Sequence, residues 1–152
     1  MGLITDISTI ITALYPASSF ILSSKFNANV TASLNSITGY PFIILDNELP
    51  ENAEIKKNNN IQKDTKILIS FLDLDSLDNT DSQSQAIQES TKIMADRVAV
   101  NIFQKLPVRP NGNQKYKITP MFHVFASNLT GVALEMYVNY NTIVNFNPTI
   151  TP

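Results

Sequence analysis

The sequence contains no cysteine and a single histidine, His123. The lack of cysteine excludes disulfides, thiolate metal sites and cysteine nucleophiles. One histidine excludes a multi-histidine metal site, and the usual nucleotide-binding, zinc-protease and serine-hydrolase motifs do not occur. A histidine within a predicted strand such as Met121–Phe125 is typically a structural residue and not a catalytic base. The sequence therefore predicts no catalytic residue, no cofactor and no metal ligand.

Charge is also scarce, because charged residues make up 16% of the chain and the net charge is −2. DNA-binding faces need a dense basic patch, so sequence-specific nucleic-acid binding is not expected. The polar surface is built from Asn, Ser and Thr instead. Such a surface suits permanent contact with other protein chains, or it reflects an AT-rich genome. No segment approaches the roughly 20 apolar residues of a membrane helix, and no export signal is recognisable, so we expect no membrane contact.

The hydrophobic pattern predicts one α+β domain over residues 1–140. Its sheet is mostly antiparallel, and an N-terminal helix and one long amphipathic helix pack on one face of it. Helical spacing of apolar residues marks the helices, and alternation or short apolar runs mark the strands. The predicted elements are a helix ending before Pro16, short strands at 20–22 and 26–34, a buried strand at 40–45, a central strand at 67–72, a helix from Ser82 or Ser84 to Leu106, and strands at 116–125 and 132–140, the last two joined by a reversal at 127–131.

Two segments lack the hydrophobic periodicity of a helix or a strand. Residues 46–66 contain Pro50, mixed charges and an Asn triplet, which predicts a long polar loop. Residues 141–152 carry apolar side chains and two prolines, which predicts an extended C-terminal arm. We expect this arm to contact a neighbouring subunit through its apolar residues, Ile143, Val144, Phe146 and Ile150.

Residues 73–81 contain four carboxylates, which is a composition similar to that of a calcium-binding loop. An EF-hand loop that starts at Asp73 needs an oxygen ligand, Gly and Glu where this chain has Leu77, Asp78 and Ser84. The spacing therefore does not fit calcium. Acids placed before a helix complement its positive end and cap its free amides, which is the role predicted here.

The order of elements resembles the tail-terminator and tail-completion proteins of tailed bacteriophages. The resemblance runs from Leu3 to Tyr140, through the Tyr-Pro-Phe strand at residues 40–42 and the long helix, and its one local motif is the hairpin sequence Asn-Leu-Thr-Gly-Val at 128–132. The Asn-rich composition is also similar to ring proteins of crAss-like phages that infect gut Bacteroidales. The polar segment 46–66 and the arm depart from the family pattern.

This resemblance implies a non-enzymatic structural protein of the virion neck, made in the host cytoplasm. As a head-to-tail connector it would form a homo-oligomeric ring, a hexamer or dodecamer, between portal and tail, and it would contact adjacent portal, neck or tail proteins. Genomic DNA would pass through its channel without sequence-specific binding. Two other interpretations stay open from the residues alone: a soluble cytoplasmic binding or regulatory domain, and a small enzyme that uses His123.

Overall fold

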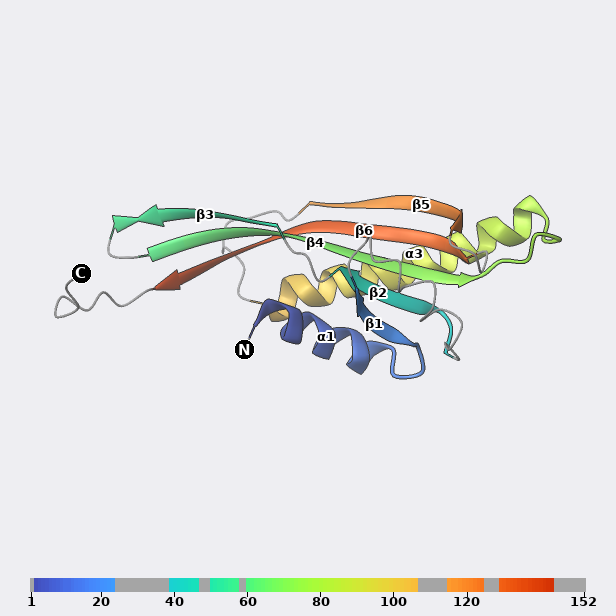
Figure 1. Cartoon of the computed structure of the whole chain (residues 1–152), viewed down its shortest axis with the longest axis horizontal. Coiled ribbons are helices and arrows are strands. Elements are labelled where there is room, and N and C mark those ends of the chain that lie inside the picture. Colours follow the sequence, from blue (N-terminus) through green and yellow to red (C-terminus); the bar gives the residue numbers. More distant parts are fainter. Residues whose placement is uncertain are drawn as a thin grey trace.

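The structure is a computed structural model that describes residues 2–23, 39–46, 50–57, 60–106, 115–124 and 129–143. They form two helices and a six-stranded mixed sheet, most of whose pairs are antiparallel, so the predicted α+β class is confirmed (Figure 1). The elements in chain order are α1 (Leu3–Leu14), β1 (Phe20–Ser23), β2 (Phe42–Asp46), β3 (Glu51–Lys56), β4 (Asn60–Leu74), α3 (Asp81–Lys105), β5 (Tyr116–Val124) and β6 (Leu129–Ile143).

The strand order is β1-β2-β4-β6-β5, and β3 pairs with the first part of β4 on the side that β2 occupies further along. Among the described strands, only the β1–β2 pair is parallel. The two longest strands, β4 and β6, pair without a break from Asn60 opposite Ile143 to Leu74 opposite Leu129. This pair is the central axis of the sheet, and every other strand is added to one of its two sides.

The main core lies between the helices and one face of the sheet. Alternate residues of β4, namely Ile67, Ile69 and Phe71, face it and are fully buried. The α3 side chains that meet them recur at helical spacing, as the amphipathic pattern predicted: Met94, Ala95, Val98, Ala99 and Ile102. A smaller cluster is formed by residues of the opposite parity, Phe42 and Ile44 of β2 with Leu72 and Leu129. Both faces of this part of the sheet are therefore apolar.

The helix starts differ in how they are capped. Helix α3 begins with a capping box, in which Thr80 accepts a hydrogen bond from the amide of Gln83 and the Gln83 side chain accepts one from the amide of Thr80. The cap is thus a threonine and not one of the preceding acids. Helix α1 starts after Gly2 without a side-chain cap.

The prediction of a long polar loop over residues 46–66 is wrong. Strands β3 and β4 form an antiparallel hairpin there, with Glu51 opposite Thr65 and Lys56 opposite Asn60. Every residue of β3 is exposed, so no apolar alternation reveals it in the sequence. The pairing is instead supported by an ion pair of 3.2 Å between Lys63 and Glu51.

Strand β6 is longer at both ends than predicted. Leu129, Thr130 and Gly131 belong to the strand and not to the reversal. At the other end, residues 141–143 pair with β4, so the arm does not begin at Asn141. The expected strand at 26–34 lies outside the described residues.

Candidate assembly surface

The sheet continues well beyond the helices at one end of the molecule (Figure 1). We call this part the β-extension and define it as Glu51–Lys56 of β3, Asn60–Thr65 of β4 and Val138–Ile143 of β6. Isolated small sheets without a packed face are marginally stable in water. Here the long strands β4 and β6 anchor the β-extension in the core, where Ile67 and Met136 are buried.

The β-extension exposes apolar surface and contains polar atoms without partners. The side chain of Ile55 is 79% exposed. Asn60 Oδ1, Asp64 Oδ1 and Thr65 Oγ1 are buried and have no hydrogen-bond partner among the described residues. Buried polar atoms without partners are rare in folded proteins, and an exposed large apolar side chain on an edge strand favours association. The exposed isoleucine, rather than the buried atoms, is typical of a surface that another chain covers.

One hydrogen bond shows which backbone groups of the β-extension point outward. The amide of Lys66 donates to the carbonyl of Pro50, at 3.0 Å, on the β3 side of β4. Lys66 therefore faces away from β6, and its opposite residue, Tyr137, forms a non-hydrogen-bonded pair with it. Because backbone groups alternate sides along a strand, Asn139 and Asn141 also direct their amides and carbonyls away from β4.

The same alternation places the outer backbone groups of β3. Asn52 and Glu54 are opposite Asp64 and Gln62, which face β3, so these pairs exchange hydrogen bonds. The residues between them, Ala53 and Ile55, direct their backbone groups to the outer side of β3. The β-extension thus has one edge on β3 and another on β6, and no strand of the described residues pairs with either.

Strand β5 ends the sheet on the other side, and its edge is different. Pro120 is opposite Val132, in a pair whose backbone groups point away from each other by the same alternation. The missing amide of Pro120 therefore lies on the outer edge, where a strand tolerates a proline. The register also shifts between Met121 and Val124. A proline and an irregularity are common devices that prevent pairing at an edge.

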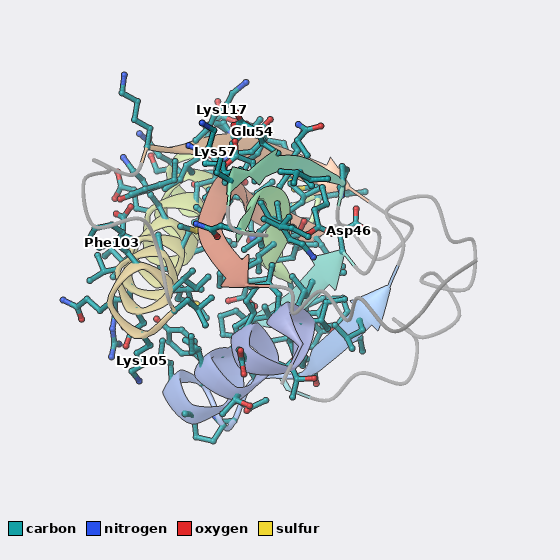
Figure 2. The ribbon with its side chains drawn as sticks, turned by 90° about the vertical axis from the view of Figure 1, so that its left-hand side faces the viewer. Asp46, Glu54, Lys57, Phe103, Lys105 and Lys117 are labelled. Carbon is teal, nitrogen blue, oxygen red and sulfur yellow. The ribbon has the colours of Figure 1, made fainter. Side chains whose placement is uncertain are left out.

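Helix α3 presents a second apolar surface on the side opposite its buried stripe. Ile93, Val100 and Phe103 are 62%, 47% and 41% exposed. Figure 2 shows Phe103 on the side of α3 that points away from α1 and the sheet.

Tyr116 of β5 crosses to α3 and donates a 2.7 Å hydrogen bond from its hydroxyl to Asp96 Oδ1. This hydrogen bond is the main cause of a raised pKa for Tyr116. Because the pKa is raised in the folded state, the stabilisation is present at neutral pH and is lost as the pH rises through the raised value. The contact fixes the start of β5 against the exposed side of the helix.

We expect Tyr116→Phe to lower the free energy of unfolding by about 0.5 kcal/mol, because the hydrogen bond is exposed and competes with water. Urea unfolding of Tyr116→Phe, Asp96→Ala and the double variant measures the coupling. Strictly additive effects in this cycle would contradict a contribution from the contact.

A shallow depression of about 390 Å³ lies beside the start of α3, lined by Asp81, Ser84, Gln85, Gln88 and Phe122. Phe122 is 55% exposed, and Gln88 Nε2 is buried without a hydrogen-bond partner in the described part of the chain. His123 follows Phe122 on β5, but its side chain lies outside the described residues. The described ranges contain no group of three or more His, Asp or Glu side chains that could hold a metal ion.

Asp75 is the one buried carboxylate of the acidic segment, at 1% exposure. It accepts 2.7 Å hydrogen bonds from the Asn79 amide, the Ser84 hydroxyl and the Thr130 hydroxyl. These donors come from the loop, from α3 and from β6. Asp75 therefore joins three elements, a role that the sequence did not predict, since its acids were assigned to capping.

The structure places only one of the predicted interface residues. Ile143 ends β6 opposite Asn60, and Val144, Phe146 and Ile150 lie outside the described residues. The edges on β3 and β6 were missed. The signal that could have indicated them is the contrast between Pro120 in β5 and the uncharged, proline-free sequence Val-Asn-Tyr-Asn-Thr-Ile at 138–143.

No protein-family model and no curated protein matches this chain. Among the described residues, no helix is long and apolar enough to cross a membrane.

Proposed function

We propose that this chain is a structural protein of the tailed-phage neck. In this proposal it is not an enzyme, and identical copies form a ring between portal and tail that extends or seals the DNA channel. The observation that carries the proposal is the β-extension, which projects from the core with one backbone edge on β3 and another on β6 that no described strand pairs with. The resemblance to tail-terminator and tail-completion proteins supplies the location in the neck.

The surface of the chain supports permanent assembly. Ile55 on the β-extension and the α3 stripe of Ile93, Val100 and Phe103 place apolar side chains in water. Burying such surface contributes roughly 25 cal/mol per Å² before the costs of ordering. The net charge of −2 adds little repulsion between copies.

Electron microscopy of the purified protein tests the proposal. We expect closed rings with an open centre, and immunogold labelling at the neck of phage particles. Particles that carry the protein elsewhere, or a protein that stays monomeric at every concentration, would contradict it.

A shortened chain tests the role of the arm. Because residues 141–143 belong to β6, the informative end point is Ile143 and not Tyr140. We expect a chain that ends at Ile143 to keep its unfolding transition and to lose ring assembly, measured by light scattering. Normal rings from this shortened chain would show that the arm is not needed.

A binding domain is the second candidate, and the depression beside α3 favours it. Phe122 offers a ring face and Gln88 an amide nitrogen that has no partner among the described residues, which together suit a small neutral polar ligand. A screen of neutral sugars and amides by ligand-observed NMR, repeated with Phe122→Ala, tests this. Binding that Phe122→Ala abolishes would favour the candidate.

A further inference from the structure

We propose that copies of this chain join head to tail by main-chain pairing, with the outer edge of β6 in one copy against the outer edge of β3 in the next. The inference rests on the proposed self-assembly and identifies the partner of the β-extension as a second copy of the same chain. The segments that pair are Val138–Ile143 and Glu51–Lys56.

The edges of the sheet differ in their ability to accept another strand, and this difference identifies β3 and β6 as the edges that pair. The edge of β5 is blocked by Pro120 and the register shift beside Met121. The edge strand β1 is only four residues long. The β-extension has the two remaining edges, in which Ala53 and Ile55 on one side and Asn139 and Asn141 on the other direct their backbone groups outward.

The sequences of the two edges are compatible in charge. Segment 138–143 has no charged residue, no proline and no glycine, and it is rich in β-branched and aromatic residues. Such an edge lacks the charges that normally prevent pairing. Strand β3 carries Glu51, Glu54 and Lys56, and in Figure 2 Glu54 is seen at the outside of the β-extension. Docked on segment 138–143, these charges meet no like charge.

Strand direction is compatible with a ring. Both β3 and β6 run antiparallel to β4, so they run parallel to each other. Rotation about an axis along the strands preserves this direction, and β6 of one copy then pairs in parallel with β3 of the next. Each copy contributes one edge of each kind, which is the heterologous arrangement that closes into a ring when the rotation permits.

Proline substitutions at outward-facing positions test the pairing. Ala53→Pro removes an amide from the β3 edge, and Asn139→Pro removes one from the β6 edge. Neither amide contributes to the hydrogen bonds of its own sheet, so both variants should fold. The matched controls are Ala53→Ser and Asn139→Ser, which keep the amide.

The measurements are sedimentation velocity for assembly and circular dichroism for folding. We expect each proline variant alone to raise the concentration of half-assembly at least about tenfold, through the lost ladder hydrogen bond and the clash of the proline ring. In an equimolar mixture, the intact β6 edge of the Ala53→Pro variant can pair with the intact β3 edge of the Asn139→Pro variant, and the two remaining edges are blocked. The mixture should therefore form a dimer and nothing larger. If either variant fails to fold, Ile55→Pro and Asn141→Pro replace the pair.

The other outcomes overturn the pairing in distinct ways. If only one of the two variants blocks assembly, the copies join through identical edges. If both variants form normal rings, the copies join through another surface, and the proposed ring survives without this pairing. If the unmodified protein never assembles, the pairing and the proposed function both fail.

Discussion

Replacing Gly131 with alanine is expected to unfold the protein or to leave it barely stable. Gly131 lies in β6 opposite Leu72 of β4. A Cβ at this position would overlap the carbonyl oxygen of Phe71 and would lie 2.9 Å from its carbonyl carbon and 3.1 Å from Leu72 Cα. All three atoms belong to the backbone, so no side-chain rotation can relieve the overlap.

Relief requires β4 and β6 to separate, and these strands form the centre of the sheet. Phe71 is fully buried between the sheet and the helices, so moving its backbone disturbs the main core. We expect Gly131→Ala to cost about 3 kcal/mol or more, at the upper end of overpacking effects. That is a large part of the 5–15 kcal/mol typical of whole domains.

Urea unfolding of Gly131→Ala beside Gly2→Ala measures the effect. Gly2 is the control because a Cβ there has nothing within 4 Å. A midpoint for Gly131→Ala equal to that of the control would mean that β4 and β6 are further apart at this position.

The sequence predicted the parts of the fold whose side chains enter the core. Apolar spacing placed α3 to within a few residues, because Met94, Val98 and Ile102 all face the sheet. It also placed the buried run that became β2 and the alternating run at Ile67–Phe71. Burial makes a periodic pattern necessary, so these elements are readable from one sequence.

The β-extension was not predictable on the same basis. Strand β3 is exposed along its whole length, so no periodicity distinguishes its six residues from a loop. Its structure is set by the partner strand, which begins only a few residues later, and by cross-strand contacts such as Lys63 with Glu51. The assembly surface was therefore hidden in the segment that was interpreted as a polar loop.

Tertiary contacts account for the other differences. The amide direction of Asn139 depends on register, and register depends on which residue of β4 lies opposite it. The Asp75 contact with Thr130 joins residues 55 positions apart. In a segment with four acids, sequence alone does not indicate which carboxylate is buried and which remain in water.

Replacing Asp75 with alanine is the second substitution with a large expected effect. It removes the acceptor of the hydroxyl hydrogen bonds from Ser84 and Thr130, which are themselves buried. Buried donors without an acceptor each cost about 1–3 kcal/mol. The Asn79 amide also loses its acceptor.

We expect Asp75→Ala to lower the free energy of unfolding by about 3 kcal/mol or more. Asp75→Asn should cost less, because its amide keeps one oxygen acceptor and the hydroxyls of Ser84 and Thr130 can rotate to accept from its nitrogen. Asp78→Ala is the matched control, since Asp78 is an exposed acid of the same loop, and it should change stability by less than about 0.5 kcal/mol.

Urea unfolding measures the free energy of unfolding of the three variants. The test is whether the loss is largest for Asp75→Ala, smaller for Asp75→Asn and smallest for Asp78→Ala. If capping or general charge near the start of α3 were the reason for the acids, Asp75 and Asp78 would have similar effects. If Asp75 stabilises the fold by joining the loop, α3 and β6, only its substitutions will be costly. The double variant Ser84→Ala, Thr130→Val removes the same hydrogen bonds as Asp75→Ala. Combining it with Asp75→Ala should therefore lower the free energy of unfolding by less than the sum of the two separate losses.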